Sequence, residues 1–442
     1  MKKTLRIAKK MAVLALALVM ALGLFGCKKS DPMPPQDMQQ LALNVVDLLC
    51  EAKIEEAYGA TTASLQYILR YDNFEMTWIG GVRHCGRLKS NLGVVLERWD
   101  SPEVYVVDVG VDFTDIGAIV RFLFNEYGEM TMMSVFTHDF HDDTPLPEGA
   151  SEKDILITTQ DGLEVHGKIT FPAGTDGAVP AAVLVPGSGA VDMDCPYGNI
   201  KIMRDIAYGL AEQGIASIRL NKRTYETTQV LSLTYSFDIE YLQDYSVAYE
   251  LLMAEPAVDS DKIFLLGHSQ GSLVIPMLDS QLDSAGLLVL AGTDRYLWEL
   301  IYDQNVQYLN FNPNIDSLNA LNTEKSKAEK LKDQAAMESQ QNSLYGTNSY
   351  YYWYDVHNKV DITQITKPVM ILRGLDDYMT YNTDWDSLLK GYENAQLTAK
   401  EYEGLSHVFA PSAGMNDTSD YYVDAHVSQE VIDDIARFIL EN

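Results

Sequence analysis

The chain has 442 residues, 47% of them apolar, so it is long enough for two folded units and apolar enough for a substantial core. Its 63 acidic residues outnumber the 33 basic ones, which gives a formal net charge of −30 at pH 7. So acidic a chain argues against nucleic acid as a partner and disfavours broad electrostatic contact with anionic lipid.

The first 27 residues have the layout of a secretory signal. A basic start, MKKTLRIAKK, precedes a mostly apolar stretch from Met11 to Gly26. This stretch is shorter than the roughly 20 residues that span a bilayer. The polar residues 28–37, which contain several prolines, predict a flexible tether.

The end of the signal, Leu24-Phe25-Gly26-Cys27, resembles the signal of bacterial lipoproteins, in which a small residue precedes a cysteine that is lipidated and becomes the mature N-terminus. Phe25 departs from the small residue usual at its place. The resemblance implies an exported protein, extracellular or periplasmic, that contacts the outer face of the cell membrane only through the lipid on Cys27. A plain cleaved signal and an uncleaved anchor are the alternatives.

Three further cysteines, Cys50, Cys85 and Cys195, remain after Cys27. An odd number cannot form a complete disulfide framework, and no two of the three have the spacing of metal ligands. A bridge between Cys50 and Cys85 stays open.

Residues 38–137 predict a small α+β domain. Apolar residues recur at helical spacing from Met38 to Tyr58, and a second helix is expected from Ala63 to Met76. Alternating residues predict a strand from Val104 to Phe113, and residues 118–136 predict two strands joined by a turn at residues 125–128. Helices followed by an antiparallel sheet resemble the cone-shaped domains of nuclear transport factor 2 type, which implies a spacer, a docking domain or a small-ligand site.

Residues 138–153 have the prolines and charges of a linker. His138 and His141, with Asp142 and Asp143, could recruit a metal ion, but they are expected to be solvated linker residues, so no metal site is predicted.

From residue 154 to the C-terminus, strands alternate with helices. Asp161-Gly162 divides two alternating runs and predicts a hairpin. Further strands are expected at residues 181–185, 215–220, 262–267, 286–292, 367–374 and 397–403, and helices at 202–213, 239–254, from 270, and 428–440. Strands that are continuously apolar predict a mostly parallel, doubly wound sheet covered on both faces. Ligands of such sheets bind at the carboxyl ends of the strands.

Residues 293–360 are too many for one crossover connection, so they predict a helical insertion or lid. Its aromatic tail, SYYYWYDV, supplies Tyr352 and Trp353 as candidate substrate-binding residues, with packing inside the lid as the alternative.

The segment LLGHSQGS places Ser269 in a G-x-S-x-G motif between a buried strand and a helix, which is the context of a nucleophile elbow. Side chains at positions 267 and 271 are expected to clash where the strand and the helix cross, hence the two glycines. Ser269 is therefore the predicted nucleophile.

A serine nucleophile needs a histidine base and an acid that orients it, downstream in the order serine, acid, histidine. Of the eight histidines, His407 follows the last strand and precedes the final helix, whereas His426 is expected to cap that helix or lie on the surface. Asp377 follows the penultimate strand and is the predicted acid, with Asp376 as the alternative.

An oxyanion hole needs backbone donors. One is expected to be the N–H of Gln270, directly after the nucleophile. The other is expected from the loop Pro186-Gly187-Ser188-Gly189 after an early strand, with Ser188 preferred to Gly189.

Residues 151–442 resemble the α/β-hydrolase superfamily, near its dienelactone-hydrolase-like and acyl-esterase branch, in LVPGSGAVDMD, IASIRLNKRTYE, FLLGHSQGS, LRGLDDYMT and YEGLSHVF. Pro186 and Ser272 replace a histidine and a glycine that are more usual there. The resemblance implies a serine hydrolase that cleaves small-molecule carboxylic esters through an acyl-enzyme, with no cofactor. The alternatives are a peptidase, amidase or acyltransferase on the same triad, and a surface binding protein that has lost catalysis.

Overall fold

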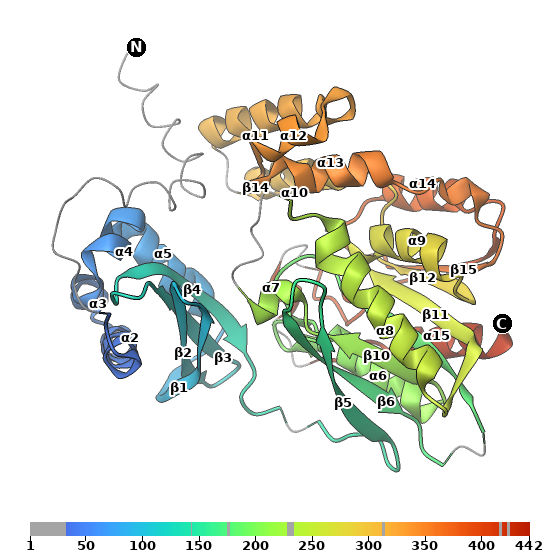
Figure 1. Ribbon diagram of the computed structural model, residues 1–442, viewed down its shortest axis with the longest axis horizontal. Coiled ribbons are helices and arrows are strands. Elements are labelled where there is room, and N and C mark those ends of the chain that lie inside the picture. Colours follow the sequence, from blue (N-terminus) through green and yellow to red (C-terminus); the bar gives the residue numbers. More distant parts are fainter. Residues whose placement is uncertain are drawn as a thin grey trace. The chain divides into compact units, whose positions relative to one another are not determined.

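The computed structural model describes residues 32–142, 144–174, 177–227, 234–311, 314–414, 418–421 and 425–442 (Figure 1). They form two compact units, one that ends at Thr144 and one that runs from Pro145 to Asn442. This boundary lies inside the expected linker. The signal, Cys27 and the start of the tether lie outside the described residues. Within the described ranges, no helix is long and apolar enough to cross a bilayer.

The first unit packs helices on an antiparallel sheet. Its helices are α2 (Pro35–Cys50), α3 (Ile54–Ala60), α4 (Ala63–Ile68) and α5 (Tyr71–Val82). Its strands, in pairing order, are β1 (Leu88–Ser101), β2 (Val104–Phe113), β3 (Gly117–Phe124) and β4 (Met130–His138). Trp78 of α5 meets the ring of Phe113 on β2, and β3 is buried along its whole length. The core of this unit therefore lies between the sheet and its helices.

Two helices and one strand of this unit differ from the sequence prediction. The helix expected from Met38 to Tyr58 is divided at Ala52, whose φ of 59° does not belong to a right-handed helix. The second expected helix is interrupted because Leu69 and Arg70 are extended. Strand β1 was not predicted: repeated register shifts against β2 break its alternation of apolar and polar residues.

The second unit is built on an eight-stranded, mostly parallel sheet. Its strands in spatial order are β5 (Ser151–Thr158), β6 (Glu164–Phe171), β10 (Ala216–Leu220), β7 (Val179–Val185), β11 (Val258–His268), β12 (Gly286–Leu290), β15 (Pro368–Gly374) and β16 (Gln396–Tyr402). The strands from β10 to β16 pair in parallel, while β5 and β6 add an antiparallel edge. This is the predicted α/β-hydrolase fold.

Helices cover both faces of this sheet (Figure 1). One face packs against α8 (Gln243–Ala254), α9 (Gly271–Leu282) and α14 (Asn382–Gly391), the last of which was not predicted. The other packs against α6 (Ile202–Glu212) and α15 (Gln429–Glu441). Val183 and Val185 of β7 belong to the first core and Ala182 and Leu184 to the second, which explains why such strands are apolar throughout.

Short elements complete the second unit: β8 (Pro196–Tyr197), β9 (Ile200–Lys201), α7 (Arg223–Glu226), a π-helical turn η3 (Asp238–Leu242), and the 3₁₀ turns η5 (Ile362–Gln364) and η6 (Thr418–Tyr421).

The expected insertion at 293–360 is helical. Its elements are α10 (Leu297–Phe311), α11 (Ile315–Ala328), η4 (Leu331–Asp333), α12 (Ala336–Gln340), the paired strands β13 (Ser343–Leu344) and β14 (Thr347–Asn348), and α13 (Ser349–Asn358). Tyr351 and Tyr352 of α13 join the core on the α8 and α9 face of the sheet. The insertion is therefore packed onto the catalytic fold.

The cysteines Cys50, Cys85 and Cys195 are free, so the bridge left open between Cys50 and Cys85 is not formed. Burial raises the pKa of the Cys195 thiol to about 12, which disfavours its reactive thiolate form. Across the described ranges, no group of three or more His, Cys, Asp or Glu residues is arranged to hold a metal ion.

Candidate active site

Ser269 stands in the sharp turn between β11 and α9. Its φ of 53° lies in the left-handed region, which is strained for a residue with a side chain. A Cβ atom at Gly267 would lie 2.4 Å from the carbonyl oxygen of Gly271, and one at Gly271 would lie 2.4 Å from that of Val185. Both glycines are therefore required for the strand and the helix to cross here, as the motif predicted.

His407 and Asp377 form a buried pair, with 2.8 Å between His407 Nδ1 and Asp377 Oδ2. The same carboxylate accepts hydrogen bonds from the backbone N–H groups of Met379 and Thr380 and from the Thr380 hydroxyl. Burial alone would raise the pKa of Asp377, but the charge and hydrogen bond of His407 and the Thr380 bonds outweigh it and lower the pKa below its usual value. An ionised Asp377 can only accept, so His407 Nδ1 carries the proton and Nε2 is left as a base.

His268 connects the turn that carries Ser269 to the loop that carries His407. Its Nε2 lies 2.9 Å from the carbonyl oxygen of His407, and the two rings are 4.8 Å apart. Because a carbonyl only accepts, His268 Nε2 must donate. Burial is the main cause that lowers the pKa of His268 to about 3, and the nearby His407 lowers it further. The ring therefore stays neutral. His426 instead lies near the Asp205 carboxylate, 3.2 Å away, and is not part of this group.

The contacts of His268 therefore link the turn that carries Ser269 to the loop that carries His407. Within the part of the chain that the structure describes, Ser269 Oγ has no hydrogen bond to His407 Nε2. Catalytic hydrogen bonds of ligand-free enzymes are often long and tighten when substrate binds.

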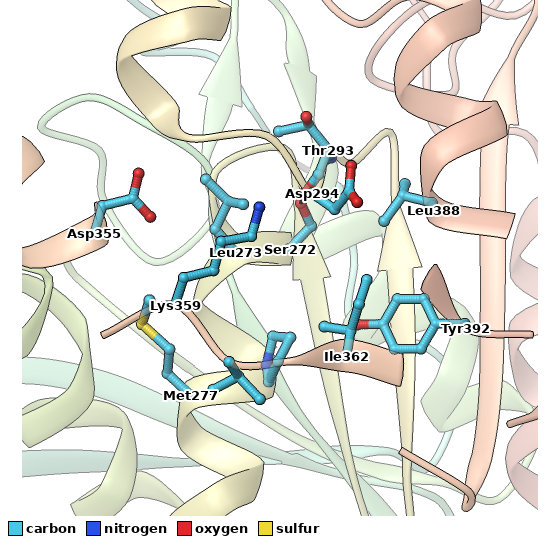
Figure 2. Close-up of a pocket in the computed structure, with 12 residues that line it drawn as sticks. Ser272, Leu273, Met277, Thr293, Asp294, Asp355, Lys359, Ile362, Leu388 and Tyr392 are labelled. Carbon is cyan, nitrogen blue, oxygen red and sulfur yellow. Dashed lines mark hydrogen bonds between the residues drawn. The ribbon is translucent and has the colours of Figure 1, made fainter. Parts of the chain in front are cut away.

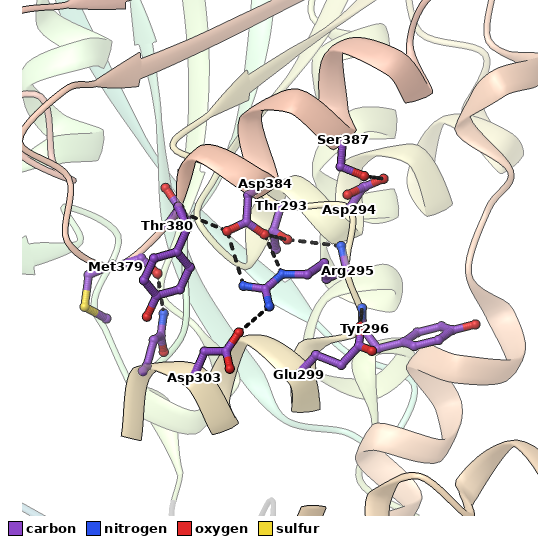
Figure 3. A network of polar contacts seen from close by, with 12 residues as sticks. Thr293, Asp294, Arg295, Tyr296, Glu299, Asp303, Met379, Thr380, Asp384 and Ser387 are labelled. Atoms are coloured by element: carbon purple, nitrogen blue, oxygen red, sulfur yellow. Dashed lines mark hydrogen bonds and ion pairs between the residues drawn. The ribbon is translucent and has the colours of Figure 1, made fainter. Parts of the chain in front are cut away.

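The loop that carries Asp377 is braced by the insertion. The guanidinium of Arg295 lies between Asp384 of α14 and Asp303 of α10 (Figure 3). Its Nε donates to Asp384 Oδ1 at 2.7 Å, and its Nη1 donates to Asp303 Oδ2 at 2.6 Å. Gln304 of α10 donates to the carbonyl oxygen of Met379, two residues after Asp377. These contacts hold the loop of Asp377 in its position. The neighbouring Asp376 is half-buried, and its backbone N–H bonds to the Leu405 carbonyl.

Both expected oxyanion donors belong to segments next to Ser269. A Cβ atom at Gly187 would lie 3.0 Å from Ser269 Cβ, so the loop after β7 runs directly past Ser269. In the described residues, the backbone N–H groups of Ser188 and Gln270 have no hydrogen-bond partner. Both are therefore free to bind negative charge on a ligand.

The chain matches no profile of a known protein family. It is 33% identical over 304 residues to Esterase EstD of Thermotoga maritima, a match that covers 67% of this chain and 69% of EstD. The chain belongs to the esterases of the α/β-hydrolase superfamily.

Among solved structures, the esterase is similar to Est1E from Butyrivibrio proteoclasticus (16% identity over 66% of this chain and 98% of Est1E, TM-score 0.42). It is also similar to the bacterial brefeldin A esterase (13% identity, 68% and 79% covered, TM-score 0.42).

The aromatic tail of the insertion contacts the turn that carries Ser269 through Tyr351. The side-chain amide of Gln270 donates to the Tyr351 hydroxyl. Tyr352 packs against Tyr345 and Tyr351, and the indole N–H of Trp353 donates to the carbonyl oxygen of Gln334. These contacts of Tyr352 and Trp353 lie within the insertion, so their expected role in substrate binding stays a prediction.

A small pocket of the esterase lies between α9 and the insertion (Figure 2). Its walls include Ser272 and Met277 of α9, Asp355 of α13 and Tyr392. Ser269, Asp377 and His407 are not among its lining residues, so the pocket adjoins α9 but does not include the candidate triad.

Proposed function

We propose that this esterase is a serine carboxylesterase in which Ser269 is the nucleophile, His407 the general base and Asp377 the residue that orients His407. The proposal is carried by the buried 2.8 Å hydrogen bond between His407 Nδ1 and Asp377. It is supported by the strained φ of 53° at Ser269, whose neighbour His268 contacts His407. The three residues follow the chain order of α/β-hydrolase triads.

The reaction uses these groups in two halves. His407 Nε2 takes the proton of Ser269 Oγ as the oxygen attacks the ester carbonyl, and the backbone N–H groups of Gln270 and Ser188 stabilise the resulting oxyanion. The imidazolium then gives its proton to the departing alcohol, which leaves an acyl group on Ser269. Water, activated by His407, attacks the acyl-enzyme and releases the acid. Side chains, backbone N–H groups and water suffice for every step, so the proposal needs no cofactor.

The proposed substrates are small-molecule esters of small or medium acyl length. The test is hydrolysis of p-nitrophenyl esters of increasing acyl length by the full chain in mild detergent, compared with Ser269→Ala and His407→Ala. We expect turnover by the wild type and a loss of at least about 10⁴-fold in both variants, since each removes a group essential to acyl transfer. Equal activity in all three proteins would refute the triad. Equal inertness on every ester would direct the search to amide and peptide substrates.

We also propose that the esterase is exported and anchored by a lipid on Cys27, on the strength of the sequence LFGC after a basic and apolar signal. Cys27→Ser is expected to abolish incorporation of radiolabelled palmitate and to release the protein from membranes. Retention of the label by the variant would contradict the anchor. The first unit is proposed to act as a spacer or docking domain for the anchored enzyme.

A further inference from the structure

A buried lysine lies directly behind the loop that carries Ser188. Lys222 stands between β10 and α7, and its ammonium group is fully buried. It donates to the carbonyl oxygen of Gly187 (3.2 Å) and to the hydroxyl of Tyr241 (2.7 Å), and it forms an ion pair with Glu240. Three acceptors thus match the three hydrogens of the ammonium group.

The carbonyl oxygen of Gly187 is held from two sides. Besides the bond from Lys222, it accepts one of 2.8 Å from the hydroxyl of Tyr241 in the π-helical turn η3. Burial is the main cause that raises the pKa of Tyr241 well above its usual value, and the nearby Glu240 adds to it. This hydroxyl therefore keeps its proton. Both lone pairs of the Gly187 oxygen are therefore occupied.

The geometry of the peptide bond carries this restraint to the active site. Gly187 and Ser188 are joined by a planar trans peptide, so the C=O of Gly187 and the N–H of Ser188 point in opposite directions. Fixing the oxygen toward Lys222 and Tyr241 turns the N–H away from them. That N–H has no partner in the described residues, and Gly187 lies against Ser269.

The same network continues to the second expected oxyanion donor. Glu240, which neutralises Lys222, also accepts a hydrogen bond from the hydroxyl of Tyr351 on α13. That hydroxyl accepts from the side chain of Gln270, whose backbone N–H is the other donor. One buried chain of contacts thus joins the oxyanion loop, the nucleophile turn and the insertion.

We infer that Lys222 and Tyr241 are positioning residues of the oxyanion hole, which aim the Ser188 N–H by holding the Gly187 carbonyl, and that Glu240 and Tyr351 extend this restraint to Gln270. The inference rests on the proposed function, because it assigns these residues a part in stabilising the oxyanion that Ser269 generates. None of them touches the reacting atoms.

The experiment compares Tyr241→Phe with Tyr245→Phe in the full chain. Tyr245 lies one turn further on, is equally buried and stacks on Tyr241, but its hydroxyl has no hydrogen-bond partner in the described residues. The two variants therefore remove the same atom from neighbouring sites. Loss of one oxyanion donor lowers kcat by about 10²- to 10³-fold. Tyr241→Phe removes only one of the two hydrogen bonds that hold the Gly187 carbonyl, so a smaller loss of about tenfold is expected.

We expect Tyr241→Phe to lower kcat for a p-nitrophenyl ester about tenfold with KM unchanged within about twofold. We also expect it to weaken binding of a trifluoromethyl ketone, whose adduct with Ser269 places an oxyanion in the same position, by a similar factor. Tyr245→Phe should match the wild type in both measurements. Tyr351→Phe should lower kcat in the same way, by a smaller factor.

Two results would overturn the inference while leaving the proposed function intact: equal effects of Tyr241→Phe and Tyr245→Phe, or a change in KM alone. Failure of the proposed function would be seen separately, as ester hydrolysis that does not depend on Ser269.

Discussion

Two adjacent carboxylates in the loop after β15 differ in what their backbone lets them reach. Asp377 faces inward and accepts hydrogen bonds from His407, Met379 and Thr380. Asp376 is half-buried and is tied to Leu405 through its backbone N–H. Of these two neighbouring residues, only Asp377 therefore bonds to His407 in the described residues.

Asp377→Asn tests this distinction. An amide placed against His407 Nδ1 offers its N–H₂ group as a donor, which favours the tautomer with the proton on Nε2, where the base is needed. We expect kcat for ester hydrolysis to fall by about 10⁴-fold with little change in fold. Asp376→Asn should stay within about twofold of the wild type. Comparable losses in the two variants would mean that the loop, rather than the Asp377 carboxylate, carries the effect.

At the scale of elements, α5 approaches β4 closely because of one of two adjacent glycines. A Cβ atom at Gly81 would lie 2.4 Å from Cγ1 of Val135 on β4, whereas one at Gly80 would meet no atom within 4 Å. Gly80 is exposed in the same helix. Alanine substitutions at the two glycines therefore distinguish the effect of helix propensity, which both share, from the effect of packing against β4, which only Gly81 has.

Gly80→Ala is expected to raise the free energy of unfolding of the first unit by about 0.5 to 1 kcal/mol, because alanine loses less backbone entropy in a helix. Gly81→Ala gains the same propensity but must displace β4, and it is expected to be net destabilising by about 1 to 3 kcal/mol. Urea unfolding followed by circular dichroism would measure both. Stabilisation by both substitutions would show that α5 is not seated against Val135.

The central strands of the second unit were predictable because each is an apolar run that ends near a glycine or a polar residue, as at Gly267 and Gly374. In the first unit, the left-handed φ of Ala52 has no sequence signal, so the break between α2 and α3 could not be foreseen.

The candidate triad could be predicted from the G-x-S-x-G motif and from the chain order of serine, acid and histidine. The partners of His268 and Lys222 could not, because they lie 139 and 35 residues away in the sequence and only the fold brings them together.

At the scale of the whole molecule, a net charge of −30 makes buried carboxylates costly unless they are paired. Asp384 and Asp244 are buried against the guanidinium groups of Arg295 and Arg223. Asp355 on α13 is buried too, but its Oδ2 accepts only from the backbone N–H of Leu297, and its Oδ1 has no partner in the described residues. It is therefore a carboxyl group that favours its protonated form.

Burial raises the pKa of Asp355 to about 7, and Glu299 adds to this increase. The Leu297 N–H and Lys359 lower the pKa but do not outweigh burial. The folded chain then keeps this proton at pH values where the unfolded chain, with a pKa of about 4, has released it. The free energy of unfolding must accordingly fall as pH rises between these two values, by at most about 1.4 kcal/mol for each pH unit.

Asp355→Asn removes this linkage, since an amide keeps the bond from Leu297 and does not ionise. We expect the free energy of unfolding of the wild type, minus that of Asp355→Asn, to decrease by about 1 kcal/mol per unit from pH 5 to pH 7 in urea titrations followed by tryptophan fluorescence. Asp316→Asn removes an exposed carboxylate of the same insertion and controls for the change in charge. A difference that stays constant with pH, or one reproduced by Asp316→Asn, would mean that Asp355 ionises as readily in the folded chain as in water.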